Sequence, residues 1–300
     1  MEKGTNINWF PGHMFKTRKQ IIEDLKLIDI VVEILDARIP ISSQNPDIKK
    51  ITENKAKVIV LNKSDLADET ETKRWIGYFN KLGIKAVSVD ANAGKGVNDV
   101  IRAVKEVYKD RQEKFEARGR IGKSIRIMIL GIPNVGKSSF INRLTKKNVA
   151  NVGNKPGVTR QKQWIRVDNE IELMDTPGIL WPKFESNKVA MNLAFTGSIK
   201  DDVLERTEIA FELTKFLLDN YFDSIVSRYK LDADNVKQIL ANEDLAQNDR
   251  IVEVIDIIAR KRGAILSGGR IDYEKISGII LDEFRSGKLG RISLENAKNS

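Results

Sequence analysis

A short glycine-rich segment carries the residue types that bind phosphate groups. Residues 131–138 read Gly-Ile-Pro-Asn-Val-Gly-Lys-Ser, which fits the pattern G-x-x-x-x-G-K-[ST]. The segment stands between an apolar, strand-like run at 124–131 and a helix predicted over 137–144. In that context backbone N–H groups and the helix N-terminus attract phosphate oxygens, whereas an ordinary glycine turn would need neither flank. We therefore predict a nucleotide phosphate site formed by Asn134, Val135, Gly136, Lys137, Ser138 and Ser139.

Two of these side chains have predicted roles in phosphate chemistry. Lys137 is expected to neutralise the outer phosphates, and Ser138 is expected to bind Mg²⁺. About forty residues later, Asp175-Thr-Pro-Gly178 follows a strand-like run and provides a carboxylate for the metal and a backbone N–H for the γ-phosphate. Thr159, which lies between the two segments, is the expected threonine that closes onto Mg²⁺ and the γ-phosphate.

A second cluster of polar residues is suited to reading a purine base. Residues 62–65 read Asn-Lys-Ser-Asp directly after the strand-like run VIVL. Asp65 can accept hydrogen bonds from guanine N1–H and its amine, a donor pair that adenine lacks. Asn62 can contact O6 or N7 of guanine and brace the loop, and the stem of Lys63 can cover the base; Ser64 stands between Lys63 and Asp65. A helix cap is the alternative for these four residues alone, but beside a phosphate loop the base site is favoured. Asp90 and Ala91, after the next predicted strand, are expected to form a second guanine loop.

The order of these motifs along the chain is unusual. The base motif at 62–65 precedes the phosphate loop by about seventy residues, whereas most GTPases have the reverse order. The sequence therefore resembles the circularly permuted GTPases, which implies a Ras-like α/β domain with a parallel-rich sheet that binds GTP and GDP. In such an order, the chain runs from the segment at 175–178 straight into the C-terminal part.

The two ends of the chain narrow the resemblance. Residues 9–14 (WFPGHM), 36–40 (DARIP) and 284–295 (FRSGKLGRISLE) resemble the ribosome biogenesis GTPase A family, the YlqF type. This resemblance covers nearly the whole chain. It implies GTP hydrolysis stimulated by ribosomal particles, and a precursor of the large ribosomal subunit with its rRNA as partners.

Hydrolysis must proceed without the glutamine that many GTPases use to orient water. The residue after Gly178 is Ile179, whose apolar side chain cannot orient the attacking water by a hydrogen bond. The family resemblance points instead to His13, the only histidine, as the group that orients or deprotonates water. The alternative is that His13 only packs against neighbouring apolar side chains. Catalysis is thus predicted for His13, Lys137 and Thr159. The resemblance to related GTPases implies that Asn134 accompanies a K⁺ ion that offsets the charge of the phosphates.

Strands alternating with helices must position these loops. Apolar runs at 30–37, 57–63, 85–89 and 124–131 alternate with helix-like segments at 16–28, 71–82, 97–118 and 137–144, a pattern typical of a parallel sheet. Residues 162–167 and 170–174 predict a strand pair about a turn at Asp168–Asn169. After about residue 205 only helix-like segments follow. We therefore predict a permuted GTPase domain over 1–200 and an all-helical, RNA- or ribosome-binding domain over 205–300.

Composition limits the class of protein. Apolar residues make up 41% and charged residues 31%, no apolar run is long enough for a membrane span, and cysteine is absent. A cytoplasmic monomer is therefore expected, with no disulfide or thiolate metal site.

The net charge is +9, although the last hundred residues carry 15 basic and 19 acidic side chains, so the excess of positive charge lies in the first two hundred residues. That excess fits RNA contact or simply a solvated basic surface. Basic residues near the C-terminus likewise either contact RNA or are solvated at helix ends: Arg260, Lys261, Arg262, Arg270, Arg285, Lys288 and Arg291.

Three functions remain open from the residues alone. The first is a Mg²⁺-dependent GTPase that acts in assembly of the large ribosomal subunit. The second is an RNA-binding switch controlled by nucleotide occupancy, in which hydrolysis is slow and incidental; Ile179 is consistent with it. The third is an ATPase or nucleotide kinase, against which Asn62 and Asp65 argue.

Overall fold

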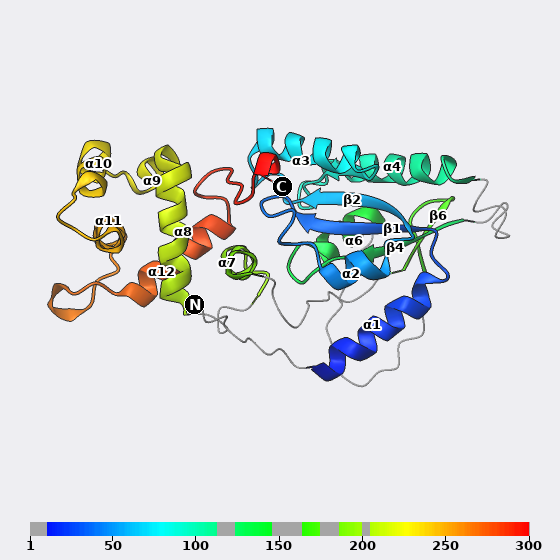
Figure 1. Ribbon diagram of the computed structural model, residues 1–300, viewed down its shortest axis with the longest axis horizontal. Helices are drawn as coiled ribbons and strands as arrows, with labels where there is room; N and C mark the ends of the chain where they lie inside the picture. Colours follow the sequence, from blue (N-terminus) through cyan, green and yellow to red (C-terminus); the bar gives the residue numbers. More distant parts are fainter. Residues whose placement is uncertain (1–10, 113–123, 146–163, 175–185, 200–204, 300) are drawn as a thin grey trace. The chain divides into compact units, whose positions relative to one another are not determined.

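The computed structural model describes residues 11–112, 124–145, 164–174, 186–199 and 205–299. It divides the chain into two compact units (Figure 1). The first, here called the sheet unit, contains Met1–Asn187 together with Ser293–Ser300, and the second, the helical unit, is Lys188–Ile292. The boundaries therefore differ from the domains predicted over 1–200 and 205–300. The helical unit begins earlier, and the last residues of the chain return to the sheet unit.

A six-stranded sheet forms the centre of the sheet unit. Its spatial order is β3-β2-β1-β4-β6-β5. All neighbouring pairs are parallel except the β5–β6 pair, which is antiparallel. This is the parallel-rich sheet that the sequence predicts. The strands are β1 (Ile30–Asp36), β2 (Ala56–Asn62), β3 (Lys85–Ser88), β4 (Ile125–Leu130), β5 (Trp164–Arg166) and β6 (Ile171–Met174).

The strand sequences explain the sheet. All seven residues of β1 are buried and five of them are apolar, because a central parallel strand is covered on both faces. At the sheet edge, the predicted turn at Asp168 is confirmed. Its carboxylate accepts hydrogen bonds from the N–H groups of Glu170 and Ile171, both at 2.8 Å, which turns the chain from β5 into β6.

Helices cover both faces of the sheet. Successive strand residues point to opposite faces, so Val31 and Leu35 of β1 face one side and Val32 the other. On the first side, Val31 belongs to a core with α1 and α2, and Leu35 to a core with Trp75 and Phe79 of α3. These helices are α1 (Pro11–Leu25), α2 (Pro46–Ile51) and α3 (Glu69–Lys81).

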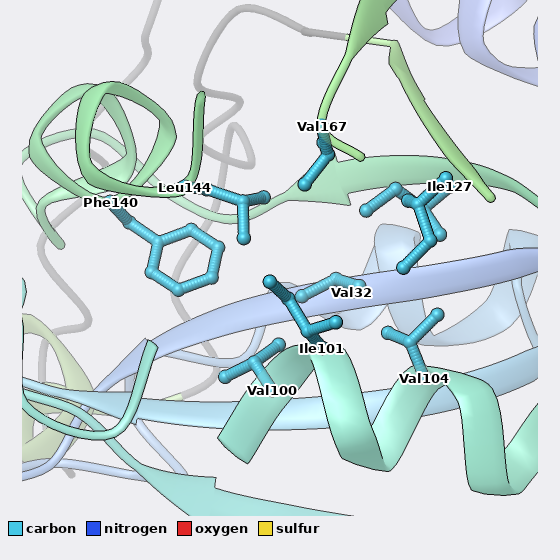
Figure 2. A pocket seen from close by; sticks show the side chains of 9 residues that line it. Val32, Val100, Ile101, Val104, Ile127, Phe140, Leu144 and Val167 are labelled. Atoms are coloured by element: carbon cyan, nitrogen blue, oxygen red, sulfur yellow. The ribbon is translucent and has the colours of Figure 1, made fainter. Parts of the chain in front are cut away.

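On the opposite face, α4 (Val97–Lys109) and α6 (Lys137–Thr145) pack over the sheet. Figure 2 shows the small cavity that remains between them and the strands, with Val104, Phe140 and Val32 pointing into it. Its lining is wholly apolar, so it does not suit a charged nucleotide. The sequence predicted a helix over 97–118, but helix α4 ends at Lys109. Residues 113–123 lie outside the described part of the chain.

The helical unit confirms the all-helical prediction for the C-terminal part of the chain, apart from one isolated bridge between Ile265 and Ile271 among its described residues. Helix α12 packs against α8. Glu283 of α12 forms ion pairs with Arg228 at 2.7 Å and Arg262 at 3.0 Å. The helices are α7 (Asn187–Phe195), α8 (Arg206–Asn220), α9 (Phe222–Tyr229), α10 (Ala233–Ala241), α11 (Gln247–Arg262) and α12 (Tyr273–Arg285).

Candidate nucleotide site

The predicted phosphate and base motifs meet at one edge of the sheet. The carboxyl ends of parallel strands lie at the same edge, which is where such sheets bind ligands. Strand β4 leads into the phosphate loop, β2 into residues 62–65, and β3 into Asp90 and Ala91. Strand β1 stands between β4 and β2 and ends at Asp36, opposite Asn62. The fold therefore brings together loops that are about seventy residues apart in sequence.

Asn62 joins three of these loops by hydrogen bonds. Its Nδ2 donates to the carbonyl of Val135 in the phosphate loop at 2.8 Å, and its Oδ1 accepts from the N–H of Ala91 at 3.2 Å. The side chain is buried. A Cβ atom at Gly136, where φ is +90°, would lie 2.3 Å from Nδ2 of Asn62, so only glycine permits this approach. The predicted bracing role of Asn62 thus extends from its own loop to the phosphate loop and the second base loop.

The phosphate loop has the backbone curvature that its motif requires. A Cβ atom at Gly131 would lie 2.6 Å from the carbonyl oxygen of Ile34 in β1, so the loop turns against that strand. Asn134 has a left-handed φ of +61° and an exposed side chain. Helix α6 begins at Lys137, whose Nζ donates to the carbonyl of Ile132 at 2.7 Å and so lies across the loop. Ser138 is exposed and Ser139 is half-buried in the first turn of α6.

Backbone hydrogen bonds fix the first base loop, which is formed by residues 62–65. Lys63 has a left-handed φ of +57°, the N–H of Ser64 donates to the carbonyl of Val89 at 3.1 Å, and that of Leu66 donates to the carbonyl of Lys63 at 2.9 Å. The side chain of Asp65 is exposed. This geometry leaves the Asp65 carboxylate accessible to a base.

Asp36, at the end of β1, anchors Lys63. Its carboxylate contacts the Lys63 ammonium at 3.1 Å and the Arg38 guanidinium through Nε at 3.0 Å and Nη2 at 2.8 Å. Burial by itself would raise the pKa of Asp36, but the two cations outweigh it and hold the pKa well below its usual range. Asp36 therefore stays ionised. Sequence reasoning treated this residue only as part of a family resemblance and did not connect it to the base loop.

The second base loop has a support that the sequence did not reveal. Arg143 of α6 donates from Nε to the carbonyl of Ala91 at 3.3 Å and from Nη2 to the carbonyl of Asn92. Oδ1 of the Asp90 carboxylate accepts from the N–H of Ala93 in the same loop at 2.9 Å. Asp90 thus closes the turn of its own loop. Nothing in the local sequence of α6 distinguishes Arg143 from an ordinary exposed arginine, so only the fold identifies it.

Several predicted site residues cannot be placed. Thr159, Asp175 and Gly178 lie outside the described residues. His13 belongs to helix α1, but only its backbone is described. The described residues contain no helix that is both long enough and apolar enough to cross a membrane.

Comparison with known proteins identifies the family. The model of the 50S ribosome-binding GTPase family matches residues 126–257, and that of the RsgA GTPase family matches residues 48–185. A curated relative from Bacillus cereus, "Ribosome biogenesis GTPase A", is 47% identical over 96% of this chain and 93% of its own length. The chain belongs to the ribosome biogenesis GTPase A family. Proteins of the same name from Bacillus pumilus and Thermotoga maritima are 44% and 31% identical, each over 98% of this chain and over 99% and 95% of their own lengths.

Solved structures agree with this family assignment. GNP-bound YlqF from T. maritima has a TM-score of 0.63 at 26% identity and covers 94% of this chain and 99% of its own. A GDP-bound YlqF structure has a TM-score of 0.65 at 26% identity, over 93% and 99% of the two chains. The likeness confirms the predicted fold, which is a permuted α/β G domain followed by a helical region.

Proposed function

We propose that this chain hydrolyses GTP in assembly of the large ribosomal subunit and that precursor particles of this subunit stimulate its turnover. The observation that carries the proposal is the bridge through Asn62, which joins the phosphate loop and the second base loop into one site. The matching family of 50S ribosome-binding GTPases and the names of the relatives support the partner.

We assign each side of the nucleotide to one group of residues. Asp65 reads the guanine edge, the stem of Lys63 covers the base, and Ser64 and Ala91 line its pocket through their backbone. Asn134, Val135, Gly136 and Ser139 contribute backbone N–H groups to the phosphates, since they belong to the loop and the first turn of α6. Lys137 exchanges its bond to the Ile132 carbonyl for the outer phosphates. Asp90 acts through its backbone, because its carboxylate closes the loop.

Divalent and monovalent cations complete this assignment. Ser138, exposed at the start of α6, would offer a hydroxyl oxygen to Mg²⁺, a cation that prefers oxygen ligands. Thr159 and Asp175, which lie outside the described residues, would supply further oxygen ligands. When bound, Mg²⁺ offsets the charge that develops on the phosphates during transfer. Gly178 is assigned to the γ-phosphate through its N–H. Asn134, held in a left-handed conformation, would bind a K⁺ ion that offsets the charge of the phosphates.

The proposed RNA partner calls for exposed basic side chains, and two of the candidates are instead half-buried and bonded within the helical unit. Arg262 is paired with Glu283, and Arg285 donates to the carbonyls of Ala194 at 2.7 Å and Phe195 at 3.1 Å. These two side chains hold the helical unit together. The remaining candidates are exposed: Arg260, Lys261, Arg270, Lys288 and Arg291.

A turnover assay tests the proposed function. Phosphate release from GTP is measured with and without large-subunit precursor particles, in K⁺ and in Na⁺ buffers, with ATP as the competing nucleotide. We expect about a tenfold or greater stimulation by particles, since positioning one transition-state group has an effect of this size or larger. Faster turnover is expected in K⁺. Particle binding that depends on nucleotide without any change in rate would instead favour the RNA-binding switch.

Replacing His13 by alanine tests its proposed role in orienting water. We expect His13→Ala to keep the affinity for GTP and to lower the particle-stimulated rate about 100-fold, the usual contribution of a general base or water-orienting group. Equilibrium binding of a fluorescent GTP analogue and single-turnover rates separate the two effects. An unchanged stimulated rate would show that His13 only packs.

A further inference from the structure

The C-terminal tail, residues 293–299, is part of the sheet unit although it follows the helical unit in sequence. Ser293, Leu294 and Glu295 are buried there. The N–H of Leu294 donates to the carbonyl of Arg38 at 2.9 Å, and Nε1 of Trp75 donates to the carbonyl of Glu295 at 3.4 Å. The tail therefore lies on the loop that follows β1 and on helix α3.

Glu295 makes the strongest of these contacts. Its Oε2 accepts from the N–H of Ile41 at 2.6 Å, and its Oε1 accepts from the N–H of Ser42 at 2.9 Å and from the Ser42 hydroxyl. Hydrogen bonds to an ionised carboxylate are about twice as strong as neutral ones. A single buried carboxylate thus fixes the tip of the loop formed by residues 37–43.

The same loop is tied to the base site through Asp36. The N–H of Asp36 donates to Oγ of Ser43 at 3.1 Å, and that hydroxyl donates to the carbonyl of Ile39 at 2.7 Å. The carboxylate of Asp36 in turn holds Lys63. A route of hydrogen bonds, the short backbone link from Ser42 to Ser43 and an ion pair therefore connects Glu295 to Lys63 in residues 62–65.

A second contact of the tail reaches the same region independently. Oγ of Ser293 accepts from the N–H of Asp68 at 3.1 Å, and Asp68 caps the start of α3 by accepting from the N–H of Glu71 at 2.9 Å. Asp68 lies three positions after Asp65. The tail thus holds the base loop at both ends, through Lys63 and through Asp68.

We propose that Glu295 is a positioning residue of the guanine site, which fixes the loop 37–43 and thereby the conformation of Lys63. The inference rests on the proposed assignment of residues 62–65 to guanine. It assigns the tail a role in nucleotide affinity that its position at the end of the chain does not suggest. Because Ser293 directly follows the helical unit, this unit is joined covalently to the base side of the site as well as to the segment at 175–187.

Glu295→Gln tests the inference without changing the size of the side chain. One carboxylate oxygen becomes an NH₂ group that faces a backbone N–H, so at least one of the three hydrogen bonds is lost. We expect the dissociation constant for GDP to rise about tenfold, as expected when a hydrogen bond to a charged group is removed. Glu69→Gln, an exposed residue at the start of α3, is the matched control and should keep the native affinity.

A double-mutant cycle with Lys63 separates positioning from general stabilisation of the fold. Lys63→Met keeps the apolar stem over the base but removes the ammonium that binds Asp36, and it should weaken GDP binding. If Glu295 acts through Lys63, Glu295→Gln should change the affinity of the Lys63→Met protein less than about twofold, since coupled residues are not additive. Independent effects, which multiply in the double variant, would overturn the inference.

Two further outcomes are decisive. Full affinity in Glu295→Gln, with weakened binding in Lys63→Met, would overturn the role of Glu295 alone; full affinity in Lys63→Met would overturn the guanine assignment and the inference together. Thermal melting of each apo protein monitors folding. If Glu295→Gln unfolds, Ser42→Ala removes one donor to the Glu295 carboxylate instead. It should raise the GDP dissociation constant about tenfold, as expected for the loss of one hydrogen bond to a charged group, and only when Lys63 is present.

Discussion

Replacing Asp65 by asparagine is expected to lower the affinity for GTP about 100-fold or more, because two hydrogen bonds to a charged acceptor are disturbed. The carboxylate of Asp65 is exposed at the sheet edge and can accept from both N1–H and the amine of guanine. An asparagine has one acceptor and turns an NH₂ group toward the guanine amine. Two donors then face each other, so the guanine edge is rejected.

The same substitution should create a new preference. Xanthine has a carbonyl oxygen where guanine has its amine, so the NH₂ group of asparagine finds an acceptor. We expect Asp65→Asn to bind xanthosine triphosphate more tightly than GTP, as measured by competition against a fluorescent nucleotide. Asp99→Asn on the exposed face of α4 is the matched control. Unchanged GTP affinity in Asp65→Asn would contradict the assignment of residues 62–65 to the base.

Replacing Asn62 by aspartate should weaken the site as a whole. Asn62 is buried, and its Nδ2 donates to the carbonyl of Val135 while Oδ1 accepts from the N–H of Ala91. Aspartate keeps the acceptor but places a second, charged oxygen against the Val135 carbonyl. Leaving such groups unpaired costs about 1–3 kcal/mol, and more for a charged one, so affinity should fall at least about tenfold.

The pattern of this loss differs from that in Asp65→Asn. Asn62→Asp should weaken GTP and GDP alike and leave the preference for guanine over xanthosine nucleotides unchanged, because the bridge positions the loops and Asp65 is intact. Titration with all three nucleotides measures this, and Asn98→Asp, an exposed residue of α4, is the control. A loss confined to guanine nucleotides would show that Asn62 acts on the base alone and that its bond to Val135 is incidental.

Local patterns were sufficient to predict most of the fold. The apolar runs that became β1, β2 and β4 are β-branched and nearly continuous, as buried parallel strands must be, and the structure places each within one or two residues of its predicted range. The turn at Asp168 was predicted because its chemistry is local. The predicted domains over 1–200 and 205–300 differ from the two units of the structure, because the course of the chain at Lys188 and Ser293 depends on packing between distant segments.

The candidate site divides in the same way. Motif residues such as Asn62, Asp65 and Lys137 can be recognised because their chemistry demands particular side chains at short spacing. Arg143 and Glu295 could not be found in this manner. Arg143 binds backbone carbonyls about fifty residues away, and Glu295 binds backbone N–H groups more than 250 residues away. A backbone partner leaves no signature in the sequence.

The sequence by itself therefore determined the chemistry that we predict for this protein: a phosphate-loop motif, a candidate guanine motif and their permuted order. Those properties depend on residue type and local order, which the chain carries directly. Only the tertiary structure decided how the motifs are held in register, through the buried amide of Asn62, the ion pairs of Asp36 and the returning tail with Glu295. These contacts join distant segments, and folding alone brings such segments within hydrogen-bond distance.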